Sequence, residues 1–425
     1  MNRVIACFAL LLSTTAFAAT PQYKVIYSFG NSSGDAGAPF AGLLIDKAGN
    51  LYGTTDYGGA GDDGAIYELS PSGTGGWTET VLYSFCASGN VECPDGARPE
   101  DALIMDAAGN LYGTTTNGGS GGLGVGAYGV VFELSPPSQQ GGAWTESVLY
   151  NFCSDYSNSI CLDGMAPYGS VVFDAAGNLY GTTFGGGTAN SGVAFELSPS
   201  ASGWTETVIH SFCSNFRGGL CLDGLLPVGG LTFDKAGNLY GTTFEGGTSP
   251  QTLGSGIIFK LSPGTNGWIE TVLYDFGLPN ATSPLTSVTM DRAGNLYGPL
   301  SESGAHGKGG LFQWVHSTGQ LREIDFKGSD GSGPDGSVLI DPLGRGFFGT
   351  ATYGGKNIGH GPAGTVYRVS PAGKKTTIYE FCSQPNCTDG MNPFGNLVED
   401  SQGNIYGTAA GGGANRAGVV YEITP

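Results

Sequence analysis

The chain has 425 residues, of which 77 are Gly and 22 are Pro, whereas charged residues make up only 12%. Hydrophobic residues reach 40% and aromatic residues 11%, which excludes a disordered polyelectrolyte, because such chains are rich in charge and poor in aromatics. Glycine at this density also excludes a helix-rich enzyme, since each helical Gly costs roughly 1 kcal/mol relative to Ala. The composition therefore indicates an all-β protein with many tight turns.

The first 18 residues have the pattern of a secretory signal peptide. Arg3 is followed by an apolar run over residues 5–12 and then by Ala16-Phe17-Ala18, a small-x-small cleavage signal. Lipoprotein acylation at Cys7 is the alternative, but the apolar run follows this cysteine instead of preceding it. No later stretch has the roughly 18 apolar residues of a transmembrane helix. We therefore expect a secreted or periplasmic protein without a transmembrane segment.

Eight of the nine cysteines lie in four close pairs. The pairs are Cys86/Cys93, Cys153/Cys161, Cys213/Cys221 and Cys382/Cys387. Metal binding would call for Cys-x-x-Cys spacing or His partners, and the whole chain has only 4 His. Because the pairs recur with the repeat described next, local pairing is favoured, and we predict four disulfides, as in other exported proteins.

One phrase recurs seven times. It runs from an Asp through Ala-Gly-Asn-Leu-Tyr to a Gly, with degraded versions in the last two copies. The copies are Asp46–Gly53, Asp106–Gly113, Asp174–Gly181, Asp234–Gly241, Asp291–Gly298, Asp341–Gly349 and Asp400–Gly407. A period of about 60 residues indicates a repeat architecture.

Each repeat contains four predicted strands. In the first repeat these are residues 43–46, 51–55, 65–69 and 77–85, with an Ala-Gly-Asn turn between the first two. Four-stranded units of this length are typical of propeller blades. The recurrent Asp lies just before the turn Gly, where a carboxylate caps backbone N–H groups, so we interpret it as structural.

The two ends of the chain predict how the ring closes. Residues 23–29 read as an outer strand, whereas the chain ends on a third-type strand over residues 419–423. The N-terminal strand would thus complete the last blade and cover an open sheet edge. We predict one domain over residues 19–425, an all-β, seven-bladed propeller with four antiparallel strands per blade, and a monomer.

The repeat resembles that of the bacterial GloVer (Gloeo/Verruco) repeat proteins. The resemblance rests on Ala-Gly-Asn-Leu-Tyr-Gly-Thr-Thr, Phe-Glu-Leu-Ser-Pro and Trp-Thr-Glu-Thr-Val-Leu-Tyr-Ser-Phe, and it covers essentially the whole mature chain. It implies export and a propeller-like β fold, but no established activity. Family members often end in an anchoring segment, whereas this chain stops at Ile423-Thr424-Pro425, which favours free secretion or periplasmic residence.

Connections between blades and between the second and third strands fall on one face in such a fold, and we expect function on that face. Four Asp-Gly motifs follow the second cysteines on this face. If their carboxylates converge at a pocket mouth, their oxygens suit Ca²⁺, and otherwise they are turn residues. These residues are Asp95, Asp163, Asp223 and Asp389. No other metal or cofactor is expected.

Charge is distributed unevenly in this acidic chain, whose net charge is −19. Most of the excess acid lies before residue 292, whereas five cationic or titratable residues lie in the second-to-third-strand connections of the last three repeats. They are His306, Lys308, Lys356, His360 and Arg416. This cationic sector would steer an anionic ligand such as an acidic glycan. The overall field repels nucleic acid.

The sequence contains no Gly-x-Ser-x-Gly, His-Glu-x-x-His or P-loop motif, and no catalytic residue is assigned. The favoured interpretation is non-catalytic binding of an extracellular polysaccharide, acidic or neutral, or of a cell-surface protein. The alternatives are a carbohydrate-active lyase or glycoside hydrolase, with His306 or His360 as acid or base, and a structural component of the envelope or matrix.

Overall fold

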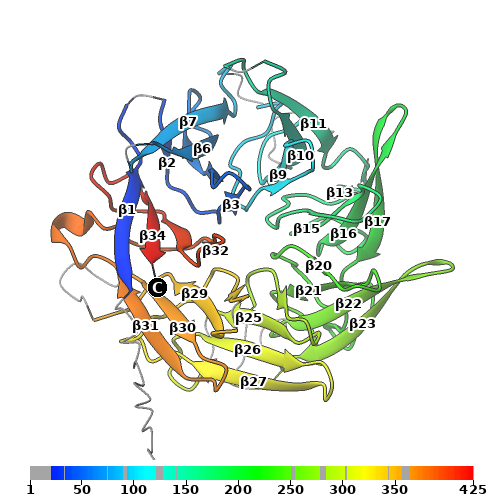
Figure 1. Ribbon diagram of the computed structural model, residues 1–425. Coiled ribbons are helices and arrows are strands. Elements are labelled where there is room, and N and C mark those ends of the chain that lie inside the picture. Colours follow the sequence, from blue (N-terminus) through cyan, green and yellow to red (C-terminus); the bar gives the residue numbers. More distant parts are fainter. Residues whose placement is uncertain are drawn as a thin grey trace, which may run out of the picture.

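The computed structural model describes residues 21–424 except 33, 74, 90–92, 121–127, 140, 250–253, 278–283, 302–303, 343 and 357–362. The predicted signal peptide and His360 therefore lie outside the described residues. Seven four-stranded antiparallel sheets surround a central axis as the blades of a propeller (Figure 1). This confirms the predicted fold. The described residues form one short 3-10 helix, η1 (Pro385–Cys387), and contain no helix that could cross a membrane.

The two strands nearest the axis in each blade are short. The first strands are β3 (Leu44–Ile45), β8 (Ile104–Met105), β14 (Val172–Phe173), β20 (Thr232–Phe233), β24 (Thr289–Met290), β28 (Leu339–Ile340) and β32 (Val398–Glu399). The second strands are β4 (Leu51–Thr55), β9 (Leu111–Thr115), β15 (Leu179–Thr183), β21 (Leu239–Thr243), β25 (Leu296–Leu300), β29 (Phe347–Ala351) and β33 (Ile405–Ala409). Strand β4 is buried along its whole length, because neighbouring blades cover both of its faces.

The two outer strands are longer. The third strands are β6 (Ala65–Pro71), β10 (Val130–Ser135), β16 (Val193–Ser200), β22 (Ile257–Gly264), β26 (Gly310–Val315), β30 (Thr365–Val369) and β34 (Val419–Thr424). The outermost strands are β7 (Trp77–Ser84), β11 (Thr145–Asn151), β17 (Gly203–Ser211), β23 (Gly267–Asp275), β27 (Gln320–Asp325), β31 (Lys375–Glu380) and β1 (Gln22–Ser28). The last of these, β1, pairs antiparallel with β34, so the N-terminal strand closes the ring as predicted (Figure 1).

Among the described residues, three short two-stranded sheets lie in the connections on one face of the disc. They are β2 (Ala36–Gly37) with β5 (Tyr57–Gly58), β12 (Tyr156–Ser157) with β13 (Ile160–Cys161), and β18 (Phe216–Arg217) with β19 (Leu220–Cys221). Unlike the 28 blade strands, these pairs lie in connections that the sequence predicted only as loops.

A glycine in each second strand makes room for an aromatic ring of the third strand. Gly53 pairs with Tyr67, and a Cβ on Gly53 would lie only 2.4 Å from the Tyr67 hydroxyl oxygen. The same pairing joins Gly113 to Phe132 and recurs in the remaining blades. These rings are fully buried or nearly so, and Phe85, at the end of blade 1, packs on Phe132 of blade 2 at 5.2 Å. The core thus runs around the ring from blade to blade.

The recurrent Asp organises the turn on the opposite face. Asp46 Oδ1 accepts hydrogen bonds from the backbone N–H groups of Ala48 and Asn50 at 2.8 and 2.9 Å, and its Oδ2 accepts one from Asn50 Nδ2 at 2.9 Å. The same set recurs at Asp106, Asp174, Asp234, Asp291 and Asp400. The predicted structural role is confirmed.

Candidate functional site

The connections that carry the cysteines share one face with the connections between second and third strands. Isolated bridges join the two kinds of loop in four places: Ala97 with Asn117, Met165 with Gly185, Leu225 with Glu245, and Met391 with Gly411. We call this side of the disc the cysteine face. Its backbone is cross-linked around the ring, so side chains on it are held on a rigid support.

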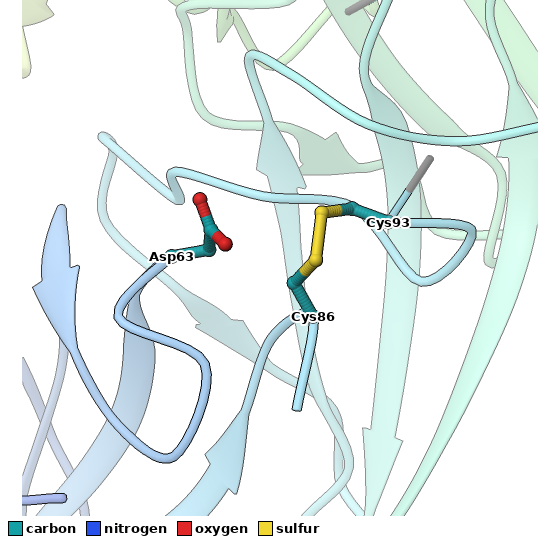
Figure 2. A group of neighbouring side chains, drawn as sticks. All are labelled: Asp63, Cys86 and Cys93. Carbon is teal, nitrogen blue, oxygen red and sulfur yellow. A yellow bond between two sulfur atoms is a disulfide. The ribbon is translucent and has the colours of Figure 1, made fainter. Parts of the chain in front are cut away.

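All four predicted disulfides form on this face: Cys86–Cys93, Cys153–Cys161, Cys213–Cys221 and Cys382–Cys387. The Asp63 carboxylate lies beside the first of them, and its oxygen and the two sulfurs are within 4.8 Å of one another (Figure 2). Because both sulfurs are bonded to each other, neither is a thiolate that could hold a metal. Disulfides persist in oxidising compartments, so the chain is a non-cytoplasmic protein.

The four Asp-Gly carboxylates lie within their own cysteine loops. Asp163 Oδ2 accepts hydrogen bonds from the Tyr150 hydroxyl at 2.7 Å and from the Ser154 N–H at 2.8 Å. Asp95, Asp223 and Asp389 make corresponding contacts with their own loops. Asp163, Asp223 and Asp389 are each 3% exposed. The contacts tie each carboxylate to its loop, and a role in binding ligand or Ca²⁺ stays a prediction.

A pocket of about 150 Å³ opens at the propeller axis. Each blade contributes to its wall the residue that follows the proline at the end of its incoming loop. These seven residues are Phe40, Glu100, Tyr168, Val228, Leu285, Asp335 and Phe394. We call this site the axial pocket. The pocket position differs in nearly every repeat, although the proline before it is present in all seven.

The aromatic and acidic residues of the axial pocket come from five consecutive blades, in the order Asp335, Phe394, Phe40, Glu100 and Tyr168 around the ring. Phe40 and Phe394, from adjoining blades, are tilted against each other with ring centroids 4.9 Å apart. Tyr168 is 37% exposed and meets Phe184 edge to face at 5.6 Å. Glu100 accepts a hydrogen bond from Thr116 Oγ1 at 3.5 Å. Apolar ring faces and hydrogen-bonding carboxyl groups thus border one small cavity.

Two carboxyl groups that line the axial pocket have a raised pKa. Burial, followed by repulsion from Asp56, raises the pKa of Glu100 to about 7, although Arg98 opposes the shift. Burial raises the pKa of Asp101 to about 6, against hydrogen bonds from Ala102 and Ser170 that favour its charged form. Near neutral pH Glu100 is therefore partly protonated and can both donate and accept hydrogen bonds, whereas Asp101 is mostly ionised and accepts them from Ala102 and Ser170.

Two grooves follow one another outward from the axial pocket across blades 5 and 6. The first, of about 450 Å³, shares Leu285 and Asp335 with the pocket. The second, of about 440 Å³, shares Lys308 and Ser332 with the first, and is also lined by Lys327 and Lys356. We call the second one the lysine groove. It joins two residues of the predicted cationic sector, Lys308 and Lys356, to a lysine that the sequence reasoning missed.

The other members of the predicted sector lie elsewhere. His306 is exposed two residues before Lys308 and does not line the lysine groove. Arg416 is exposed in the connection between β33 and β34 of blade 7, outside both grooves. The ligand role of these residues stays a prediction.

Sequence reasoning also missed the axial pocket. The signal was present: after the prolines 39, 99, 167, 227, 284, 334 and 393, the next residue varies between aromatic, acidic and aliphatic types. In a ring, a single repeat position is brought to the axis seven times, so variation at that position changes one shared site.

The family model for the Gloeobacter/Verrucomicrobia repeat matches residues 13–253 and 249–425. The chain belongs to this repeat family. The match bears out the resemblance read from the repeat phrase, and it spans all seven blades. No curated protein matches the sequence.

Solved structures similar to this repeat-family protein share its fold at low identity. A fungal alcohol oxidase of the AA5 family, in complex with copper, is 16% identical with a TM-score of 0.55, over 96% of this chain and 77% of the oxidase. An ulvan lyase of polysaccharide lyase family PL25, bound to a saccharide, is 12% identical with a TM-score of 0.54, over 94% of each chain. At these identities the likeness concerns the fold alone.

Proposed function

We propose that the protein is a secreted or periplasmic carbohydrate-binding protein that holds the end of a saccharide chain in the axial pocket. The observation that carries the proposal is the convergence on one cavity of seven residues from one repeat position, whose residue type changes from blade to blade. A purely structural disc would need no such variation at its axis.

The lining of the pocket supports a sugar ligand. A sugar ring has apolar C–H faces and polar hydroxyl edges, and ligand pockets combine aromatic walls with a few placed polar groups. Phe40, Phe394 and Tyr168 supply ring faces, while Glu100 and Asp335 supply hydrogen-bonding oxygens. The volume of about 150 Å³ is smaller than the roughly 300 Å³ that drug-sized ligands need, so it suits one sugar residue.

The test is calorimetric titration of a panel of neutral and acidic oligosaccharides into the wild-type protein and two variants. In one variant, Phe40→Ala is combined with Phe394→Ala to remove the paired rings. We expect affinity to fall at least tenfold, because each ring contributes on the order of 1 kcal/mol. Phe216→Ala is the matched control, since Phe216 is 63% exposed in a cysteine loop and does not line the pocket. Equal loss in both variants, or no binding to wild type, would overturn the proposal.

Glycoside hydrolysis is a second candidate, favoured by Glu100. A carboxyl group with a pKa of about 7 that lines a sugar-sized pocket suits a general acid. Release of reducing ends from a bound oligosaccharide, abolished by Glu100→Gln while binding persists, would establish hydrolysis. Binding without any turnover over days would leave the non-catalytic role.

A further inference from the structure

We propose that the lysine groove is a subsite for the anionic groups of a polysaccharide, so that the preferred ligand is a chain bearing carboxylate or sulfate substituents. The inference rests on the proposed function, because the lysine groove is connected to the axial pocket through the first groove, with which it shares Lys308 and Ser332. It is carried by three lysines that belong to three different connections and meet at one groove.

None of the three lysines belongs to the repeat pattern. The place of Lys308 is taken in the other blades by Asp63, Tyr128, Ser191, Ser255, Ala363 and Ala417. The place of Lys356 is taken by Ala60, Ser120, Thr188, Thr248, Ala305 and Ala414. Lysine at both places is confined to the two neighbouring blades that form the groove. If these lysines served only to keep the protein in solution, we would not expect them to gather at one groove.

Lys327 occupies the place of a cysteine. It follows Phe326 at the end of the outer strand of blade 5, where four other connections have the first cysteine of a disulfide: Cys86, Cys153, Cys213 and Cys382. The connection from residue 327 to residue 334 is therefore short and has no disulfide-linked hairpin. The lysine groove lies over this short connection, lined by Gly328 and Ser329, and the aliphatic stem of Lys308 packs beside Gly328.

The acidic residue within this connection, Asp330, is paired with a buried lysine. Asp330 forms an ion pair with Lys375 at 3.1 Å, and the Lys375 side chain is only 7% exposed. In blades 1–4 the residue at the place of Lys375 is a glutamate: Glu79, Glu146, Glu206 and Glu270. Within the described residues, Lys308 and Lys327 form no ion pair, and Lys356 pairs with Glu380 at 3.4 Å while remaining 77% exposed. The groove is thus cationic although the whole protein is acidic.

The experiment compares three oligosaccharides of equal length: a neutral xylan fragment, a polygalacturonate fragment whose only charges are carboxylates, and a κ-carrageenan fragment whose only charges are sulfate esters. They are titrated into wild type and into a triple variant, Lys308→Gln, Lys327→Gln and Lys356→Gln. The matched control is Lys47→Gln, Lys235→Gln and Arg292→Gln, which removes three exposed cations from the turns of the opposite face. Both variants change the net charge by the same amount, so only the position of the charge differs.

We expect at least one anionic fragment to bind wild type more tightly than the neutral one, and the charged fragment that does so identifies the substituent. The groove variant should lose about tenfold in affinity for that fragment at low salt, as expected for three exposed charge contacts, and the loss should shrink at 0.5 M NaCl. The opposite-face variant should change affinity less than twofold. If saccharides bind through Phe40 and Phe394 but the groove variant matches the control, the subsite is overturned and the proposed function stands. If no saccharide binds wild type, both fail.

Discussion

Asp163 shows what a single residue of the cysteine face does. Its carboxylate is 3% exposed and joins the Tyr150 hydroxyl at the end of β11 to the Ser154 N–H at the start of the disulfide loop. An ionised acceptor makes stronger hydrogen bonds than a neutral one. Asp163 therefore fixes the disulfide loop against its own blade. The Asp-Gly pair in the sequence predicted only a turn at this position and not this contact.

We predict that Asp163→Asn destabilises the protein by about 1–3 kcal/mol, because the Tyr150 hydroxyl or the Ser154 N–H loses its charged hydrogen-bond acceptor. Equilibrium unfolding in denaturant measures the change. Asp155→Asn is the control, because Asp155 is exposed in the same loop and should cost less than about 0.5 kcal/mol. An equal effect of both substitutions would mean that net charge, and not the buried contact, matters.

The sequence shows which residue types occupy the pocket position of each repeat, but it does not show that these residues lie close together in space. Phe40 and Phe394 are 354 positions apart and touch only because β1 closes the ring. Likewise, Lys308 and Lys356 were singled out by their charge, whereas Lys327 was not, because its placement depends on the missing disulfide hairpin. Convergence of this kind arises from the ring geometry, which local patterns do not encode.

At the scale of elements, the repeat predicted the blades closely and their connections poorly. The second strand of blade 1 was predicted at residues 51–55 and observed as Leu51–Thr55, because a repeated pattern of buried residues defines it. The pairs β12–β13 and β18–β19 were missed, since four residues with a disulfide do not show the alternation of a strand. A disulfide closes the loop that contains each pair, and we infer that it holds the two strands together.

We therefore predict that Cys153→Ser with Cys161→Ser lowers the free energy of unfolding by about 2–3 kcal/mol, the value expected for a loop of this length. Far-ultraviolet circular dichroism should stay unchanged, because the blade strands do not depend on the hairpin. Limited proteolysis should cut the variant between residues 153 and 161 and leave the wild-type loop intact. An uncut variant of unchanged stability would show that packing alone orders the loop.

At the scale of the whole molecule, the interface that each of blades 1 to 4 makes with the blade before it is sensitive to pH. Glu79, Glu146 and Glu270 each have a pKa raised to about 7, and that of Glu206 is raised to about 8. Burial is the main cause, and a nearby carboxylate adds to it: Asp35 for Glu79, Asp95 for Glu146, Asp163 for Glu206 and Asp223 for Glu270. In each glutamate, Oε1 is buried and has no hydrogen-bond partner among the described residues. Each of these interfaces favours the neutral acid.

The aspartates in the turns of the opposite face make stability depend on pH in the opposite sense. Although burial opposes the shift, hydrogen bonds from asparagine and from backbone N–H groups lower the pKa of Asp106, Asp174, Asp234, Asp291 and Asp400. Their stabilisation is present above the ordinary aspartate pKa of about 4 and is lost as the pH falls below it. The glutamates bind more protons in the folded state between about pH 4.5 and 8, so their contribution is lost as the pH rises through that range.

These two groups together predict greatest stability near pH 4.5–5, with the free energy of unfolding falling toward pH 8. Replacing the four glutamates by Gln removes the ionisation but keeps the shape of the side chains. The decrease in the free energy of unfolding between pH 4.5 and 8 should then be smaller by at least about 1.4 kcal/mol. This value corresponds to a shift of one pKa unit on one group, and it allows for the partial exposure of the glutamates. Denaturant unfolding from pH 4.5 to 8 measures it, with Glu133→Gln as a single-site control in the third strand of blade 2. If the quadruple variant kept the full pH dependence, the blade interfaces would not be its source. If it lost that dependence, ionisation of these four buried glutamates would be the cause of the lower stability at higher pH.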